Sequence, residues 1–396
     1  MQKKRSPIPA VYLHIPFCRT ICPFCSFTVR RDRAKMHEKY IRGMVDEIDR
    51  RAEMLKDMER KENEEKLSGQ ILLKSIYIGG GTPSCLTIPE VSVLLTKVRE
   101  NFPWSDQIEI AFELNPDDVN PEYLSGLADI GVNRLSLGGQ SFQTSTLQKL
   151  GRCHTVADLR NAIAVITNSS FDNWNLDLMF GIPEQSIVMF KNDVEEALRY
   201  EPSHISLYGL EIHERTPFGN NPQIRNWEPE HLEQFEEMYL WATDNLEKAG
   251  LFQYEISNFS KKTNEGRQNL LVWSGQEYLG FGVGAHSYHR QTRWGNVRSI
   301  RTYLQHLGQN TWPTEFIEQL SAKQLAVEFL MLGLRQCEGI NIKEWQTRYG
   351  LHLQNQQLNF VQELCDDGRA FWEGQHLCLT PKGMLLADRI TVQLMP

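Results

Sequence analysis

Short apolar runs alternate with helix-prone segments through the first half of the chain. Each run is continuous enough to predict a strand that is buried on both faces, as in a parallel sheet. The predicted strands are Ala10–Ile15, Ser75–Ile78, Ile108–Leu114, Arg134–Leu137, Asn175–Met179 and Ile205–Tyr208. Apolar residues at helical spacing predict helices in the segments between the strands. These helices are Ala34–Lys66, Pro89–Phe102, Pro121–Ile130, Thr144–Leu150, Val156–Asn168 and Ser186–Tyr200.

Strands that alternate with helices favour an α/β fold with a parallel sheet and right-handed crossovers. About six such units fit between residues 10 and 212, which is too few for a closed eight-unit barrel. We therefore predict a partial, open (β/α)6 barrel over residues 1–215, with a doubly wound sheet as the alternative.

The pattern changes after this region. Residues 216–320 contain one clear helix, a possible strand at Tyr254–Asn258 and a glycine-rich turn at 280–287, and we expect this extension to complete the site. Residues 321–396 read as helices followed by a hairpin, which is typical of a winged-helix-like domain. Because Lys and Arg are not concentrated there, a lid or interaction module is favoured over nucleic-acid binding.

Composition narrows the class of protein. The formal net charge of −8 over 396 residues argues against non-specific nucleic-acid binding. No run approaches about 18 consecutive apolar residues, so no membrane span is expected. The basic N-terminus is not followed by the apolar segment of a secretory signal. Eight scattered cysteines suit a reducing compartment, and we expect a cytoplasmic protein.

Three cysteines follow the first predicted strand in the pattern C-x3-C-x2-C: Cys18, Cys22 and Cys25. They could be small buried residues, ligands of a structural zinc ion or ligands of an iron–sulfur cluster. Zinc normally needs a second ligand pair, and the remaining five cysteines form none. A three-thiolate cluster site is therefore favoured, in which one iron has no protein thiolate.

Polar and glycine residues recur where the predicted strands end. Carboxyl ends of parallel strands share one edge, so these positions are expected to gather at one rim. They are Cys18, Cys22, Cys25, Gly79–Thr82, Glu113, Gln140, Asp177 and Tyr208. The glycines would let a ligand approach the backbone closely. Glu113 and Asp177 could cap helices, or could hold an amine, an ammonium group or ribose hydroxyls.

Several motifs together resemble a known family. The cysteine pattern after Tyr-x-His-Ile-Pro-Phe resembles the cluster loop of radical S-adenosylmethionine (SAM) proteins. The segments at 79–83, 133–142, 176–183, 254–259 and 282–287 narrow the resemblance to the oxygen-independent coproporphyrinogen III oxidase family, and within it to the heme chaperone branch. The match continues into Met331–Arg335 and Leu379–Gly383.

This resemblance implies a radical-SAM-type barrel that carries a [4Fe–4S] cluster on Cys18, Cys22 and Cys25, with SAM on the open iron. Matching positions imply contacts with one or two SAM molecules. These positions are Tyr12, Phe24, Gly80, Gly81, Thr82, Glu113, Gln140, Arg152 and Asp177, together with Gly209 and His286 in weaker matching segments.

Two departures from the family patterns bear on function. The oxidases carry a further cysteine at the position of Phe27, which favours the chaperone branch. That branch carries His-Asn-x-x-Tyr-Trp, and the histidine, implicated in holding heme, is Gln268 here, while the tyrosine is Val272. Glutamine is a poor iron ligand. If heme binds, His286, His289, Cys153 or His154 could replace that histidine.

The arginines between residues 267 and 301 either form a solvated surface or line a pocket for an acidic, flat ligand. They are Arg267, Arg290, Arg293, Arg298 and Arg301.

The leading hypothesis is a protein that binds a [4Fe–4S] cluster, SAM and heme, and passes heme to an acceptor protein. The alternatives are an oxygen-independent coproporphyrinogen III oxidase, which produces protoporphyrinogen IX, and a non-catalytic binding protein that keeps only the cluster.

Overall fold

The computed structural model describes residues 8–61 and 72–396. The basic N-terminus and the end of the charged helix expected up to Lys66 lie outside the described residues. The chain divides into two compact units. The first comprises the chain up to Gly138, Gly151–Trp174 and Gln276–Gln319, and the second comprises Gly139–Leu150, Asn175–Gly275 and Leu320–Pro396.

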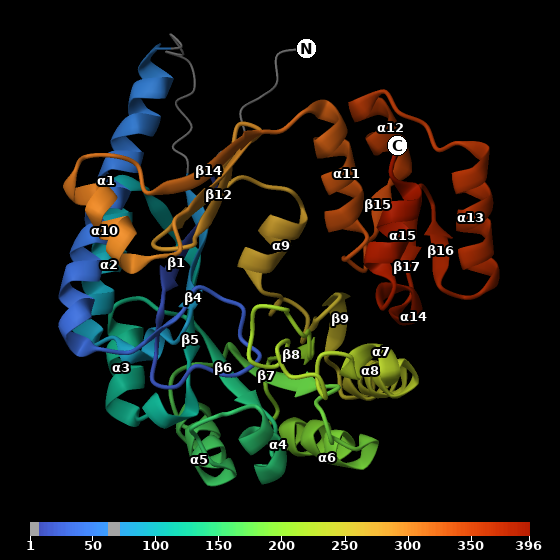
Figure 1. Ribbon diagram of the computed structural model, residues 1–396, viewed down its shortest axis with the longest axis horizontal. Coiled ribbons are helices and arrows are strands. Elements are labelled where there is room, and N and C mark those ends of the chain that lie inside the picture. The colour runs from blue at the N-terminus through green and yellow to red at the C-terminus, as the bar shows by residue number, and fades with distance from the viewer. Residues whose placement is uncertain (1–7, 62–71) are drawn as a thin grey trace. The chain divides into compact units, whose positions relative to one another are not determined.

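The six predicted strands are all present, and the chain forms a helix after each of them (Figure 1). The strands are β1 (Ala10–Ile15), β4 (Leu73–Gly80), β5 (Trp104–Leu114), β6 (Arg134–Gln140), β7 (Trp174–Phe180) and β8 (His204–Gly209). The helices that follow them are α1 (His37–Lys61), α2 (Ile88–Asn101), α3 (Pro121–Asp129), α4 (Thr144–Lys149), α5 (Val156–Thr167), α6 (Ile187–Leu198), α7 (Trp227–Glu230) and α8 (Leu232–Lys248). The prediction of six successive strand–helix units is confirmed.

In the first unit, strands lie side by side in the order β14-β13-β12-β11-β1-β4-β5-β6. Strand β1 pairs in parallel with both β4 and β11 (Tyr278–Phe281). It is therefore central, and five of its six side chains are buried. This burial explains its continuous apolar sequence, since each fully buried Leu or Ile contributes about 1.5–3 kcal/mol of transfer free energy.

Antiparallel strands extend the same sheet beyond β11. They are β12 (His286–His289), β13 (Thr292–Asn296) and β14 (Thr314–Gln319), with α10 (Ile300–Gly308) between the last two. None of these strands, nor β11, was predicted. Figure 1 shows α1, α2 and α10 lying along one side of the strands of this unit.

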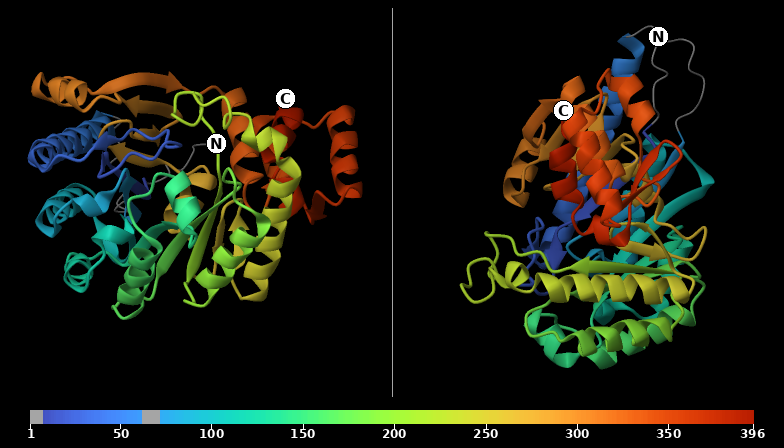
Figure 2. Two further views of the ribbon diagram at one scale, coloured as in Figure 1. Left: turned by 60° about the horizontal axis from the view of Figure 1, so that its bottom comes forward. Right: turned by 90° about the vertical axis from the view of Figure 1, so that its right-hand side faces the viewer.

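In the second unit, β7 pairs in parallel with β8, and β8 pairs with the hairpin of β9 (Phe252–Glu255) and β10 (Asn258–Ser260). The single strand predicted at Tyr254–Asn258 is therefore wrong, because the chain turns back at residues 256–257. Helices α6 and α8 pack together, and α8 runs beside β9 (Figure 2).

The end of the chain, also in the second unit, has its own core around Trp345, whose indole Nε1 donates to the Ala326 oxygen at 3.0 Å. Its elements are α11 (Ala322–Gly333), α12 (Ile342–Tyr349), α13 (Asn355–Asp366), α14 (Pro381–Met384), α15 (Ala387–Leu394) and the strands β15 (Ile340–Asn341), β16 (Ala370–Glu373) and β17 (His376–Leu379). The strands form a sheet in the order β15-β17-β16. This arrangement is the expected winged-helix-like combination of helices and a small sheet.

Among the described helices, none is both long and apolar enough to span a bilayer. The three-part division into 1–215, 216–320 and 321–396 stays a prediction.

Candidate functional site

The three cysteines lie on a loop that is closed at its base. Strand β2 (Phe17–Cys18) pairs in parallel with β3 (Arg30–Arg31). The Arg30 amide donates to the Pro16 oxygen at 2.6 Å, and the Asp32 amide to the Cys18 oxygen at 2.8 Å. Within the loop, the Cys25 amide donates to the Cys22 oxygen at 3.1 Å. Backbone hydrogen bonds at the base of the loop and within it therefore fix the segment around Phe24, directly after β1.

The thiols differ in exposure. Cys18 is buried, whereas Cys22 and Cys25 are partly exposed. Burial raises the pKa of Cys18 to about 11 and also raises the pKa of Cys25, while the positive charge of Arg152 works against both shifts. Metal ligation requires thiolates, so metal binding at this loop must release protons.

The glycines at 80 and 81 let the backbone pass close to this loop. A Cβ atom on Gly81 would lie 2.8 Å from the Cys18 sulfur and 2.8 Å from the Phe17 oxygen. Gly80 has φ +117°, and a Cβ there would lie 2.5 Å from the His14 ring. Only glycine fits these positions without a shift of the cluster loop or of β1. Thr82 follows directly, and its side chain hydrogen-bonds to Cys18.

Glu113 lies on β5 and faces the end of β4. Its carboxylate accepts hydrogen bonds from the Tyr77 hydroxyl at 2.8 Å and from the Gly80 amide at 3.1 Å. Tyr77 in turn stacks on Tyr12 of β1, with ring centroids 6.2 Å apart. The predicted gathering of Glu113 and Gly80 at one rim is thus observed within the first unit, and Tyr12, which only the family resemblance implied, lies beside them.

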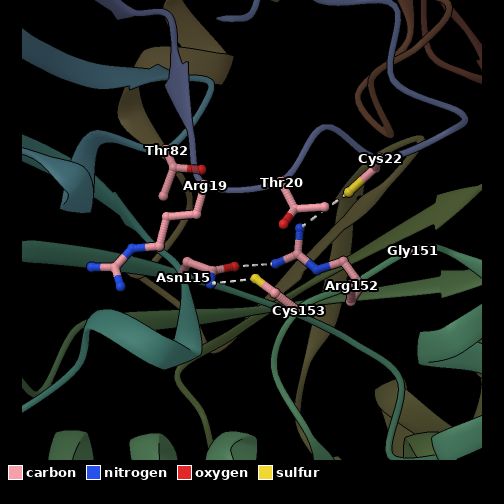
Figure 3. A pocket seen from close by; sticks show the side chains of 8 residues that line it. All are labelled: Arg19, Thr20, Cys22, Thr82, Asn115, Gly151, Arg152 and Cys153. Carbon is pink, nitrogen blue, oxygen red and sulfur yellow. Dashed lines mark hydrogen bonds between the residues drawn. The ribbon is translucent and has the colours of Figure 1, made fainter. Parts of the chain in front are cut away.

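Arg152 spans from the loop after α4 to the cluster loop (Figure 3). Its Nη1 lies 3.8 Å from the Cys22 sulfur, and its Nη2 donates to the Gly138 oxygen at 3.0 Å and to Asn115. A small pocket surrounds this guanidinium. The residues that line it are Arg19, Thr20, Cys22, Thr82, Asn115, Gly151, Arg152 and Cys153.

Sequence reasoning missed Asn115 and Cys153 as neighbours in this pocket. The Asn115 amide nitrogen donates to Asp117 at 3.0 Å and lies 3.8 Å from the Cys153 sulfur, while that thiol donates to Asp117 at 2.8 Å. The position of Asn115 directly after a strand end could have indicated it. Cys153 was named only as a possible heme ligand, and nothing in the sequence pattern placed it in this pocket.

His14 was also missed, although it lies on the same face of β1 as Tyr12. Its Nδ1 accepts from the Tyr12 hydroxyl at 2.9 Å, and its Nε2 donates to the Thr28 oxygen at 2.7 Å. A neutral ring satisfies both bonds. His14 thereby connects β1, Gly80 and the far end of the cluster loop.

We expect His14 to make the protein less stable in acid. Burial lowers the pKa of His14 to about 4 from 6.5, so between these values the unfolded chain binds the proton more tightly. The contribution to the free energy of unfolding is therefore complete above about pH 6.5 and falls by about 2–3 kcal/mol as pH drops to about 4. Urea unfolding at pH 7 and pH 4.5 should show a smaller loss for His14→Gln than for the wild type. If the free energy of unfolding fell equally in His14→Gln and in the wild type, His14 would not be the cause of the acid sensitivity.

His286 and Phe27 lie near the far side of the cluster loop. Arg298 donates from Nε to the Thr28 hydroxyl at 3.1 Å and from Nη2 to the Ser26 oxygen at 3.2 Å, and so brackets Phe27. The Phe27 side chain itself is 70% exposed. His286 begins β12, and the charge of the same Arg298 acts on its ring.

The other predicted residues belong to the second unit. Gln140 ends β6 with a φ of +69°, a left-handed conformation that is rare for glutamine. The Asn175 amide donates to the Asp177 carboxylate at 2.7 Å on β7. Gly209 ends β8, where a Cβ would lie 2.9 Å from the Phe235 ring. Gln140 and Gly209 end their strands, whereas Asp177 lies in the middle of β7 and not at its end as predicted.

A single-ion site does not fit the cysteine loop. Within residues 8–61 and 72–396, no three Cys, His, Asp or Glu side chains gather closely enough to hold one metal ion. In a cluster each thiolate binds a different iron, so the three sulfurs need not converge on one point. By the chemistry of the donors, three thiolates without a second ligand pair suit an iron–sulfur cluster better than zinc.

Comparison with known protein families gives two matches. The Radical SAM superfamily model matches residues 12–197, and the HemN C-terminal domain model matches residues 320–386. The fold class predicted from sequence is confirmed by the first match. Membership of this superfamily implies a [4Fe–4S] cluster and SAM.

Among solved structures, coproporphyrinogen III oxidase (HemN) from Escherichia coli superposes with a TM-score of 0.80, covering 99% of this chain and 90% of that chain. The sequence identity is 20%, so this likeness establishes the fold alone.

Curated relatives extend over nearly the whole chain. Heme chaperone HemW of Bacillus subtilis is 33% identical over 96% of this chain and 97% of its own length. Heme chaperone HemW of Lactococcus lactis is 30% identical, with 96% of each chain covered. Heme chaperone HemW of Escherichia coli is 33% identical over 71% of this chain and 70% of its own length. With 33% and 30% identity to the first two relatives over 96% of this chain, the chain belongs to the heme chaperone HemW family of radical SAM proteins.

Proposed function

We propose that this protein binds heme and delivers it to an acceptor protein. The observation that carries the proposal is the relationship to HemW of Bacillus subtilis, 33% identity over 96% of this chain. The exposed Phe27, which follows Cys25 by two residues, supports it, because the oxidases that the sequence resembles carry a further cysteine at that position.

The cofactor part of the proposal assigns the cluster to Cys18, Cys22 and Cys25. One-electron transfer to SAM is the chemistry that such a cluster supplies when bound. Gly81 leaves room beside the Cys18 sulfur, and Arg152 places positive charge beside the Cys22 sulfur. A cation at this point offsets the negative charge of clustered thiolates.

We assign the SAM contacts to residues at the strand ends and to their neighbours on the strands and loops beside them. Glu113 is already held by Tyr77 and the Gly80 amide, so its carboxylate is pre-oriented at the rim. The remaining SAM contacts that we assign are Tyr12, Phe24, Gly80, Gly81, Thr82, Gln140, Arg152, Asp177 and Gly209, whereas His286 is assigned to heme below. An acceptor protein and a cytoplasmic setting stay predictions from the family resemblance and from the cysteine usage.

Oxygen-independent coproporphyrinogen III oxidase is the weaker candidate. The likeness to HemN is one of fold, at 20% identity, and Phe27 cannot supply a thiolate. Incubation of the reconstituted protein with SAM, reductant and coproporphyrinogen III should therefore give no protoporphyrinogen.

Heme titration of the anaerobically reconstituted protein tests the main proposal. We expect a saturable Soret change near one equivalent, followed by loss of that signal from the protein when an apo-acceptor is added. A Soret change that grows linearly without saturation would mean that heme adsorbs non-specifically, and the chaperone proposal would then be abandoned.

A further inference from the structure

One face of the antiparallel strands β12, β13 and β14 carries an unusual combination of side chains. The register pairs His286 with Gly295 and Gly295 with Phe316. Two residues along, it pairs Tyr288 with Arg293 and Arg293 with Glu318. Side chains at directly paired positions point to the same face of a sheet, as do residues two apart on one strand. These six positions therefore share one face.

Gly295 lies in the middle of this face, and it has no side chain to cover the sheet there. A Cβ atom there would lie 2.4 Å from the Phe316 ring, so the phenyl ring extends over the glycine. It reaches His286, with ring centroids 5.4 Å apart and planes inclined at 65°. The result is an aromatic pair in which the phenyl ring and the imidazole meet edge to face.

This face is open around His286 and Phe316. On the opposite face, Trp294 is buried against the guanidinium of Arg51 from α1, 4.8 Å from the ring centroid. His286, in contrast, is exposed, and Phe316 is 39% exposed. A ligand can reach the His286 face without displacing α1.

The His286 ring is available as a ligand. Within the described residues it makes no hydrogen bond, whereas most other histidine rings are engaged. His14, His37 and His204 use both ring nitrogens, and His289 is held by Glu277 at 2.5 Å. Burial, and then the charges of Arg293 and Arg298, lower the pKa of His286, so its ring is neutral at pH 7 and keeps a lone pair for a metal.

The charges around His286 suit an anionic ligand. Arg293 and Arg298 both act on its ring, and Arg298 also holds the cluster loop at Ser26 and Thr28. Glu315 acts in the opposite sense, and Glu318 faces Arg293 in the register. An acidic ligand must therefore compete with Glu318 for Arg293. Arg298 lies beyond the end of β13, so the register pairs no carboxylate with it.

Heme matches this surface in each respect. Its iron takes imidazole as an axial ligand, its flat macrocycle packs on aromatic rings, and its two propionates pair with arginine. Gln268, at the position where relatives in the resemblance carry histidine, is buried in α9 (Arg267–Trp273), and an amide is a poor iron ligand.

We propose that His286 is the iron ligand for heme in this chain, with Phe316 packing on the macrocycle and Arg293 and Arg298 pairing with the propionates. This inference rests on the proposed heme-binding function and names the site at which it occurs.

The test is a titration of ferric heme into the reconstituted full-length protein and three variants: His286→Ala, His286→Met and His289→Ala. His289→Ala is the matched control, because it removes an imidazole from the other face of the same strand. We expect His286→Ala to weaken heme binding by at least about tenfold, as loss of a metal-site residue does, and His289→Ala to change it by less than about twofold. Added imidazole should restore the histidine-type spectrum of His286→Ala.

His286→Met gives a readout that a structural role would not produce. The ligand signature in the near-infrared and resonance Raman spectra should change from histidine to methionine. Heme dimethyl ester, which lacks free carboxylates, should bind the wild type more weakly than heme, and Arg293→Gln should reduce that preference.

The outcomes separate the two proposals. No saturable heme binding by the wild type would overturn both the function and the site. Saturable binding with an unchanged affinity and an unchanged histidine signature in His286→Ala and His286→Met would overturn the site alone. Loss of affinity in His289→Ala with none in His286→Ala would assign the iron to the opposite face and also overturn it.

Discussion

Replacement of Cys18 by serine is expected to abolish the iron–sulfur cluster. Cys18 is the buried member of the set, and its sulfur lies beneath Gly81, so a nearby residue has little room to substitute for it. A serine hydroxyl is a hard, neutral donor that suits iron–sulfur ligation poorly. Iron in the reconstituted variant should fall from about four atoms per chain to below about one. Iron analysis and the visible absorbance of the anaerobic protein measure this directly.

Cys153→Ser is the matched control for this experiment. Cys153 lines the same pocket as Cys22, but it lies outside the C-x3-C-x2-C loop and donates its thiol proton to Asp117. We expect wild-type iron content from this variant. If Cys153→Ser lost iron as completely as Cys18→Ser, a fourth protein ligand would be present, and the open iron position assigned to SAM would not exist. Full iron retention by Cys18→Ser would refute the cysteine assignment itself.

The parallel strands could be predicted because they are buried on both faces. Ala10–Ile15 and Arg134–Gln140 are continuous runs of mostly buried residues, and such runs are visible in the sequence alone. Strand β11 could not be recognised, since Tyr278–Phe281 is four residues long and contains Gly280. It becomes a strand through pairing with β1, more than 260 residues earlier, as between Ala10 and Tyr278. Such long-range pairing leaves no local periodicity.

The same distinction applies to the candidate site. The strand-end rule located the cysteine loop, the glycines and Glu113, because parallel strands bring their carboxyl ends to one edge. Arg152 came only from the family resemblance, since it lies in a loop after α4 and reaches the site through a long side chain. The face around His286 depends on antiparallel register between β12, β13 and β14, which residue patterns at this length do not define.

Glu47→Ala is expected to cause a large loss of stability, because Glu47 is a fully buried carboxylate at the centre of a polar network in the first unit. It accepts hydrogen bonds from the Gly282 amide at 2.9 Å, the Asn296 amide group at 2.6 Å and the Tyr303 hydroxyl at 2.6 Å. The variant would leave these three donors without this acceptor and the nearby buried Arg51 guanidinium without the adjacent negative charge. We expect the free energy of unfolding to fall by about 3–5 kcal/mol, measured by urea denaturation at pH 7.

The network also determines which segment the substitution of Glu47 destabilises. Gly282, with φ +97°, precedes the turn into β12, and Asn296 ends β13, so Glu47 fixes both ends of the segment that carries His286. Glu53→Ala, an exposed position on the same helix, should change stability by no more than about 0.5 kcal/mol. Glu47→Gln keeps one acceptor but places an amide donor against other donors, so an intermediate loss is expected. A loss below about 1 kcal/mol for Glu47→Ala would show that water replaces the carboxylate and that the network does not hold this segment.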